Sequence, residues 1–217
     1  MNVQDKNKKG LFIVLDGGEG AGKTTVAHKV VNQLGWNAIY TREPGGSPYA
    51  ERIRELILSD EAKMSDAETQ FALFWAARRD HLRHTIIPAL SAGKIVITDR
   101  FDSSSYAYQI IAQGNRQLEE LFWQKRKHFL QDYEPDIYIF LDITPEEGLK
   151  RAYSRGEENI NHFDKRKIDF HKKVYSGLNE FIISKVNGVR IDATQPIESV
   201  VKDVMNVINE AKRTDKA

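Results

Sequence analysis

The chain has 217 residues, which is within the range of one α/β domain, and 32 basic side chains nearly balance 31 acidic ones. This balance gives no support for nucleic-acid binding, and the absence of cysteine excludes disulfides, thiolate metal sites and a cysteine nucleophile. Residues 1–9 lack the apolar core of a signal peptide, and no apolar run approaches the roughly 20 residues that span a bilayer. We therefore expect a soluble, cytoplasmic protein with a single domain over 10–212 and short tails at 1–9 and 213–217.

The first predicted strand leads into a phosphate-binding loop. Five apolar residues, 11–15, precede the pattern Gly-x-x-x-x-Gly-Lys-Thr at 17–24, and a helical pattern continues from residue 26. Glycines let successive backbone N–H groups point into one anion-sized concavity, and the helix start adds its positive dipole end. Lys23 supplies a cation for the β- and γ-phosphates, and the Thr24 hydroxyl is placed to bind Mg²⁺.

The alternative interpretation of this loop is a glycine-rich turn that binds no ligand. The complete motif, between a strand and a helix, favours a nucleoside triphosphate site instead. The residues predicted to hold the triphosphate are Gly17, Gly18, Glu19, Gly20, Ala21, Gly22, Lys23, Thr24 and Thr25.

Short apolar strands alternate with helical patterns along the rest of the chain. The expected strands lie at 37–41, 94–98, 137–141 and 189–191, and the expected helices at 47–58, 66–90, 104–112, 118–130, 144–155, 164–186 and 197–208. This alternation predicts a three-layer α/β fold, with a five-stranded parallel sheet covered by helices on both faces. Ligands of such sheets bind beyond the carboxyl ends of the strands. The polar residues at these predicted ends are Asp16, Arg42, Asp99, Arg100, Asp142 and Asp192.

Asp99 and Arg100 add an acid near the expected Mg²⁺ position and a guanidinium able to grip a phosphate. A surface ion pair is the alternative, and the phosphate-binding loop makes it the weaker one. The sequence has no Asn-Lys-x-Asp guanine-reading motif, no run of acids after a strand as in motor ATPases, and no second domain for mechanical coupling. These absences favour a phosphoryl-transfer enzyme with a small acceptor.

Several motifs in a fixed order are more specific than any one of them. They are Gly-Gly-Glu-Gly-Ala-Gly-Lys-Thr-Thr (17–25), Thr-Arg-Glu-Pro-Gly-Gly (41–46), Phe-Trp-Ala-Ala-Arg (74–78), Asp-Arg-Phe-Asp-Ser-Ser-Ser-Tyr-Ala-Tyr-Gln (99–109), Leu-Asp-Ile-Thr-Pro-Glu (141–146), Arg-Gly-Glu (155–157) and Ile-Asp-Ala-Thr (191–194). With these motifs the chain resembles the bacterial thymidylate kinases from about residue 11 to residue 208. The family reaction converts ATP and thymidine monophosphate into ADP and thymidine diphosphate.

The resemblance implies a site for thymidine monophosphate. Phe74 would stack on the thymine ring and Arg78 would donate to a base carbonyl, and their i,i+4 spacing puts both on one helix face. Without the resemblance, Phe74 would be read as a core residue and Arg78 as a solvated helix end. Tyr108 would fill the space of a ribose 2′-hydroxyl and so select deoxyribose, and Glu19 would accept from the sugar 3′-hydroxyl. The other implied acceptor contacts are Arg42 and Arg100 at the monophosphate and, on one helical face with Tyr108, Ser104, Ser105 and Gln109 toward the base.

Phosphoryl transfer needs alignment and charge stabilisation rather than a covalent intermediate. The implied cofactor is Mg²⁺, bound directly by Thr24 and through water by Asp99. Because the phosphate-binding loop contains no arginine, the resemblance implies that a mobile lid at about 151–167 brings the catalytic cation. The candidate catalytic residues are Lys23, Arg100, Arg151 and Arg155.

Arg155 is the main candidate for the lid cation, and Arg151 also matches the basic pattern of the lid. The chain then departs from its apparent relatives, because residues 159–161 read Asn-Ile-Asn where another arginine is common. The basic residues 165–167 are either a substitute or a solvated patch. The resemblance also implies a homodimer, with no nucleic-acid or membrane partner. Two other hypotheses remain: a kinase of another nucleotide or small metabolite on the same fold, and a slowly hydrolysing nucleotide-binding switch.

Overall fold

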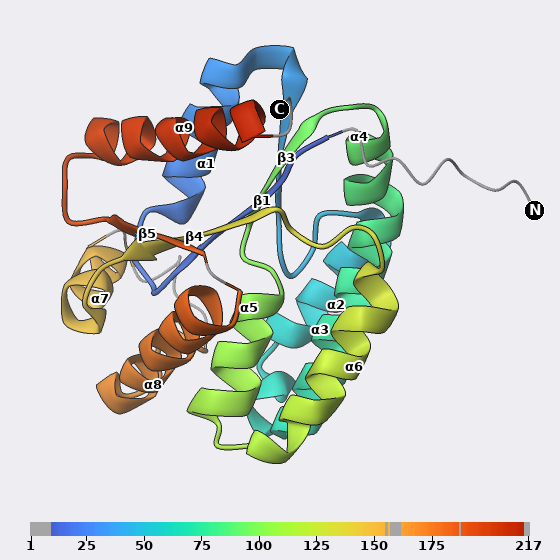
Figure 1. The fold of residues 1–217 in the computed structure, drawn as a ribbon. Coiled ribbons are helices and arrows are strands. Elements are labelled where there is room, and N and C mark those ends of the chain that lie inside the picture. Colours follow the sequence, from blue (N-terminus) through green and yellow to red (C-terminus); the bar gives the residue numbers. More distant parts are fainter. Residues whose placement is uncertain (1–9, 155, 157–161, 187, 215–217) are drawn as a thin grey trace, which may run out of the picture.

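Five parallel strands form a sheet through the centre of the molecule (Figure 1). They are β1 (Phe12–Gly17), β2 (Ala38–Arg42), β3 (Ile95–Asp99), β4 (Ile137–Asp142) and β5 (Val189–Asp192). Their order across the sheet is β2-β3-β1-β4-β5. The computed structural model describes residues 10–154, 156, 162–186 and 188–214. The predicted five-stranded parallel sheet is confirmed.

Helices cover both faces of this sheet (Figure 1). On one face lie α1 (Lys23–Leu34) and α9 (Ile197–Thr214), which pack against each other. The opposite face carries α2 (Pro48–Leu58), α3 (Ala67–His81), α4 (Ile87–Ser91), α5 (Asp102–Ser105), α6 (Glu119–Leu130) and α8 (Ile168–Asn179). The remaining helix, α7 (Pro145–Tyr153), packs against α8.

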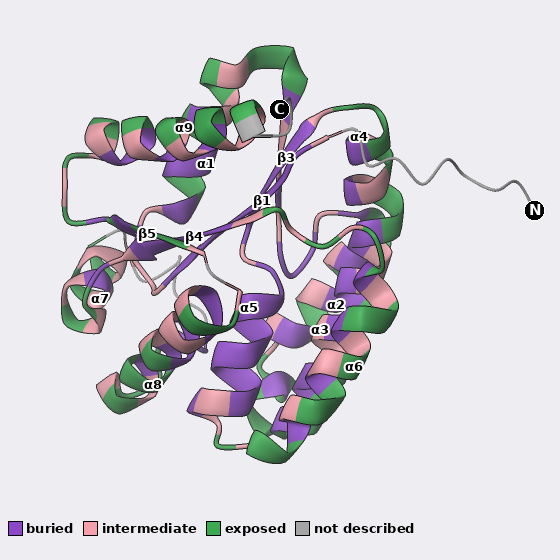
Figure 2. Cartoon of the chain, in the orientation of Figure 1, coloured by how far each residue is buried: buried purple, intermediate pink, exposed green. Residues whose placement is uncertain are grey.

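The alternation of side chains along β1 explains the two apolar layers. Phe12 and Val14 belong to the core under α2, α3 and α6, whereas Ile13 and Leu15 belong to the core under α1 and α9. Successive side chains of a strand point to opposite faces, so a continuous apolar run suits a strand buried on both sides. Figure 2 shows the resulting burial along the strands and the inward faces of the helices.

The helical segments differ in detail from the predicted ones. Residues 66–90 form α3 and α4 with a π-helical turn, Leu82–Ile86, between them, and Pro88 is accommodated in the first turn of α4. Similar π-helical turns, Tyr106–Ala112 and Glu180–Lys185, extend α5 and α8. The helix expected from residue 164 begins at Ile168 instead, because residues 162–166 form turns.

The sheet brings the ends of its central strands to the phosphate-binding loop. Asp99 lies in register with Leu15 of β1 and with Arg42 of β2. Among the described residues, none of the helices combines the length and apolarity needed to cross a membrane. The predicted tail at 1–9 lies outside the described residues, and the division into one domain with a lid stays a prediction.

Candidate active site

The loop between β1 and α1 curls around the side chain of Lys23. Its ammonium group donates to the carbonyl oxygens of Gly17 at 3.1 Å and Gly18 at 2.8 Å. Gly20 and Gly22 have φ of +70° and +84°, in the left-handed region that side chains other than glycine rarely adopt. A Cβ on Gly20 would also collide with the carbonyl group of Gly148, so the backbone approach there requires glycine. Burial lowers the pKa of Lys23, and Arg100 lowers it further.

Thr24 and Asp99 lie together at the start of α1 and the end of β3. The Thr24 hydroxyl donates to Asp99 Oδ2 at 2.5 Å. Hydroxyl and carboxylate oxygens are the donors that Mg²⁺ prefers, and Mg²⁺ usually keeps several water or phosphate ligands besides one or two from the protein. In the described part of the chain no group of three or more acidic, histidine or cysteine side chains could enclose a metal. The pair therefore fits a magnesium ion shared with a nucleotide.

Arg100 lies at the centre of a buried charged group. Its guanidinium contacts Glu19 at 2.5 Å, Asp16 at 3.4 Å and the Ser104 hydroxyl at 3.3 Å. Burial would lower the pKa of Arg100, but Glu19, Tyr108 and Asp16 raise it well above its usual value. Its backbone has φ of +70°, a strained conformation for a residue with a side chain. The fold therefore holds this cation in a specific orientation.

Glu19 is held ionised between two partners. It accepts from the Tyr108 hydroxyl at 2.8 Å and pairs with Arg100. Burial would raise the pKa of Glu19, but Arg100 and Lys23 outweigh it and lower the pKa to about 2. The neighbouring Asp16 is fully buried and accepts from Ser104 at 2.9 Å; its pKa is raised by burial. These contacts fix Tyr108 and Ser104 beside the phosphate-binding loop.

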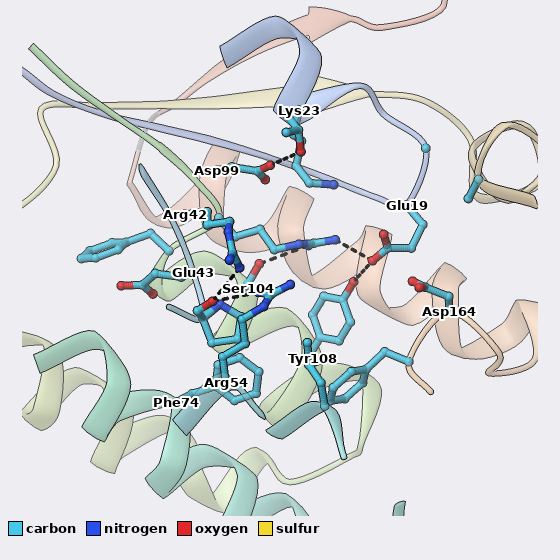
Figure 3. A pocket seen from close by; sticks show the side chains of 18 of the residues that line it. Glu19, Lys23, Arg42, Glu43, Arg54, Phe74, Asp99, Ser104, Tyr108 and Asp164 are labelled. Carbon is cyan, nitrogen blue, oxygen red and sulfur yellow. Dashed lines mark hydrogen bonds and ion pairs between the residues drawn. The ribbon is translucent and has the colours of Figure 1, made fainter. Parts of the chain in front are cut away.

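One cavity of about 310 Å³ connects this loop to α3 (Figure 3). Lys23 and Asp99 lie at one end of the view, Phe74 at the other, and Arg42 and Arg54 between them. The predicted site residues that line it are Glu19, Gly20, Gly22, Lys23, Thr24, Thr25, Arg42, Phe74, Arg78, Asp99, Arg100, Ser104 and Tyr108. The structure thus brings together most of the residues predicted for the two nucleotides.

Arg78 is buried rather than solvated. Only 1% of it is exposed, and its Nε donates to Glu43 at 2.8 Å while Nη2 donates to the Phe101 carbonyl at 3.0 Å and Ser105 at 3.1 Å. Its Nη1 lies buried without a hydrogen-bond partner in the described structure. A buried guanidinium nitrogen without a partner costs free energy unless a ligand accepts from it. Arg78 and Phe74 both line the cavity.

Some predicted residues do not line the cavity. The Ser105 hydroxyl accepts a hydrogen bond from Arg78 at 3.1 Å. The side-chain amide of Gln109 is fully buried and has no hydrogen-bond partner among the described residues. Arg151 donates to Glu147 at 3.2 Å and to the Ala193 carbonyl at 2.9 Å. The others that do not line it are Gly17, Gly18 and Ala21, and Arg155 lies outside the described residues.

The strand ends also differ in what they reach. Asp142 accepts from Tyr175 at 2.8 Å and pairs with Arg190, and Asp192 accepts from Thr194. Neither aspartate lines the cavity. Among the described strand ends, those of β1, β2 and β3 therefore border the cavity, together with residues of α2, α3 and α7 and the segment 163–164.

Sequence reasoning missed several residues of the cavity. Arg54 lies on α2 and donates to the Pro44 carbonyl at 2.8 Å, and burial together with Arg42 lowers its pKa. Phe163 and Asp164 also line the cavity. The Phe163 ring packs edge-on against the Tyr108 ring, with 5.8 Å between the ring centres. The sequence carries no signal for Arg54, since Glu55 and Leu56 also lie between the buried Ile53 and Ile57 and are exposed. No sequence signal marks residues 163 and 164 either.

Comparison with known proteins agrees with this geometry. The family model for thymidylate kinase matches residues 15–204. The thymidylate kinase of Clostridium novyi is 41% identical over 200 residues, covering 90% of this chain and 97% of the relative; that of Bacillus licheniformis is 41% identical over 211 residues, covering 95% and 99%. The crystal structure of thymidylate kinase from Ehrlichia chaffeensis superposes with a TM-score of 0.72 at 28% identity, over 92% of this chain and 98% of that one. The chain belongs to the thymidylate kinase family.

Proposed function

We propose that the chain transfers the γ-phosphoryl group of ATP to thymidine monophosphate, with ADP and thymidine diphosphate as products. The observation that carries this proposal is the cavity that extends from the phosphate-binding loop to the Phe74 and Arg78 side chains. A donor nucleotide at one end and an acceptor nucleotide at the other would meet beside Arg100. Direct transfer requires this kind of in-line alignment.

At the donor end, the loop amides and Lys23 hold the β- and γ-phosphates. Thr24 and Asp99 would hold Mg²⁺, which supplies positive charge against the phosphate oxygens when it is bound. The hydrogen bonds of Lys23 to Gly17 and Gly18 keep its ammonium group inside the curl of the loop. The chain thus concentrates positive charge where the transferred group becomes more negative.

At the acceptor end, Arg42 and Arg100 bind the monophosphate. Arg42 reaches this position from the end of β2, where it pairs with Glu51 at 3.0 Å, and Arg54 adds a further cation nearby. Arg100 keeps its charge because Glu19 and Asp16 surround it. A guanidinium held in this way orients a phosphate through two parallel hydrogen bonds.

The sugar and base contacts follow from side chains fixed in the cavity. The Tyr108 ring is held by its bond to Glu19, so it excludes a 2′-hydroxyl sterically while Glu19 accepts from the 3′-hydroxyl. Phe74 stacks on the base, and Arg78 donates through Nη1 to a base carbonyl. Thymine has a carbonyl oxygen at position 4 where cytosine has an amino group, so a fixed donor favours thymine.

The remaining parts of the mechanism stay predictions. Arg155 is proposed as the lid cation, and the contacts of Arg151 with Glu147 and Ala193 favour a supporting role on α7. A homodimer in the cytoplasm is likewise a proposal from the family resemblance.

A panel of acceptors tests the proposed function. ADP release is measured in a coupled assay with ATP and Mg²⁺ and, in turn, thymidine, deoxyuridine, deoxycytidine, deoxyguanosine and cytidine monophosphates, with a sample lacking any acceptor as control. Turnover is expected with thymidine monophosphate well above the control. Turnover with guanylate or cytidylate but not with thymidine monophosphate would indicate a different kinase. Tight ATP binding without transfer to any acceptor would indicate a nucleotide-binding switch.

A further inference from the structure

A buried chain of hydrogen bonds runs from the end of β2 to the base end of the cavity. Glu43 accepts through Oε2 from Arg78 Nε at 2.8 Å and lies through Oε1 3.1 Å from His81 Nδ1. His81 Nε2 lies 2.6 Å from the Thr41 hydroxyl. At most 5% of each of these side chains is exposed. Glu43 appears at the edge of the cavity in Figure 3.

Each hydrogen-bond donor in this buried series of side chains has one acceptor. A carboxylate only accepts, so Nδ1 of His81 must carry the hydrogen that bonds Glu43. In the neutral ring Nε2 then accepts from the Thr41 hydroxyl, and both oxygens of Glu43 are used. The neutral Nδ1–H tautomer therefore satisfies all of these hydrogen bonds, whereas a flip of the imidazole ring would remove both bonds that the ring makes.

The Arg78 guanidinium is fixed on its other side as well. Nη2 donates to the Phe101 carbonyl and the Ser105 hydroxyl, and the guanidinium carbon lies 4.7 Å from the centre of the Trp75 ring. With Nε and Nη2 bonded, Nη1 is left unpartnered in the described structure. Because the guanidinium is planar, its contacts with Glu43, Phe101 and Ser105 together set the direction of Nη1, and the contact with Glu43 is the ionic one.

We propose that Glu43 and His81 are positioning residues that set the base specificity of this enzyme by orienting Arg78. This inference rests on the proposed function, in which Nη1 donates to the base. The negative charge of Glu43 offsets the free-energy cost of burying the Arg78 guanidinium. The hydrogen bond from His81 fixes the orientation of the Glu43 carboxylate. Thr41 and the tight packing of Gly46 hold the His81 ring, since a Cβ on Gly46 would collide with it.

Glu43 also connects Arg78, at the base end of the cavity, with the residues proposed to bind the monophosphate. Glu43 lies between Arg42, assigned to the monophosphate, and Pro44, whose carbonyl accepts from both Arg42 at 3.4 Å and Arg54 at 2.8 Å. The Glu43 backbone N–H also donates to the Asp99 carbonyl at 3.0 Å. Displacement of Glu43 would therefore disturb the acceptor site more than the loop that holds ATP.

The decisive experiment compares thymidine and deoxycytidine monophosphates in Glu43→Gln. The glutamine removes the negative charge that pairs with Arg78. Its amino group faces either Arg78, where one donor meets another, or His81, whose ring must then take the Nε2–H tautomer and donate to the Thr41 hydroxyl. We expect kcat/KM for thymidine monophosphate over that for deoxycytidine monophosphate to fall about tenfold or more, with KM for thymidine monophosphate raised similarly. KM for ATP is expected to stay within about twofold, since the Glu43 side chain bonds Arg78 and His81 and the substitution keeps its backbone bond to Asp99. The selectivity ratio does not depend on how much of a variant is folded.

Two substitutions at His81 separate positioning from packing. His81→Asn places an amide N–H near Nδ1 and keeps the bond to Glu43, whereas His81→Gln reaches toward Thr41 and loses it. We expect His81→Asn to keep more of the selectivity than His81→Gln. The matched control is His84→Gln, because His84 is 55% exposed and pairs with Asp80 rather than with Glu43; its kinetics are expected to be unchanged.

The outcomes are distinguishable. Absence of thymidine monophosphate turnover in the unsubstituted protein would overturn the proposed function itself. Normal turnover together with an unchanged selectivity ratio in Glu43→Gln and His81→Gln would overturn the positioning role alone. An equal loss of selectivity in His81→Asn and His81→Gln would show that His81 contributes by packing rather than by its hydrogen bond to Glu43. A rise in KM for ATP as large as that for the acceptor would show the same for Glu43.

Discussion

The strongest stability prediction concerns Asp102, which begins the helix that carries Ser104 and Tyr108. Its side chain is fully buried and accepts from the Tyr138 hydroxyl at 2.7 Å, Arg126 Nε at 2.9 Å and the Ser103 N–H at 3.0 Å. Asp102→Ala removes all three hydrogen bonds at once. The partners stay buried, since Arg126 is 8% and Tyr138 3% exposed.

The expected loss follows from the partners that remain. Removing one member of a buried ion pair costs about 3–5 kcal/mol, but Arg126 keeps Glu134 at 2.7 Å, which favours the lower end, about 3 kcal/mol. The unpaired Tyr138 hydroxyl adds about 1 kcal/mol. The free energy of unfolding should therefore fall by about 4 kcal/mol, which corresponds to a melting temperature lower by about 8–16 °C in a domain of this size.

Urea unfolding followed by tryptophan fluorescence measures this loss, and an unchanged m-value would show that the unfolding reaction is the same. Asp102→Asn should lose less, because Oδ1 still accepts from Tyr138 and Ser103. Lys29→Ala, in an exposed ion pair with Glu198, is the control and should leave the midpoint nearly unchanged. A loss below about 1 kcal/mol in Asp102→Ala, or additive effects of Asp102→Ala and Arg126→Met, would refute the reasoning.

Three further predictions concern the phosphate-binding loop and a residue packed against it. Lys23→Ala should lower kcat about 10²–10³-fold in the coupled assay, because a charge next to the transferred group is lost; near-normal turnover would remove Lys23 from the mechanism. Gly148→Ala should raise KM for ATP although alanine favours a helix, because its Cβ would collide with the carbonyl of Glu19; unchanged ATP kinetics would contradict this close approach. The pKa of Glu19 is about 2 when folded, below its ordinary value near 4.5, so the stability it contributes is complete above about pH 4.5 and lost as the pH falls toward 2. Denaturation midpoints between pH 5 and 2 should therefore fall less steeply in Glu19→Gln, and parallel curves would count against this.

Local sequence patterns were sufficient for the fold and for the donor end of the site. The apolar runs of the central strands are buried on both faces, and the glycines and Lys23 of the loop act through the backbone of their own segment. Such features depend on neighbours in the chain, so spacing alone predicts them. The meeting of Thr24 with Asp99 followed from the rule that parallel strands end at one edge.

The direction of individual side chains was decided by tertiary contacts. Arg78 lies in a helix pattern that permits either a solvated or a buried end. Its contacts with the buried Glu43, just after β2, and with Phe101 and Ser105 select the second. Arg151 fits a basic lid pattern, yet its hydrogen bonds lead to Glu147 and Ala193. A long side chain takes the orientation in which its charge is best paired, and that partner is brought near only when segments far apart in the sequence pack together. The sequence by itself therefore determined the sheet and the phosphate-binding loop, and the packing of α2 and α3 against β2 and β3 decided how the base end of the site is built.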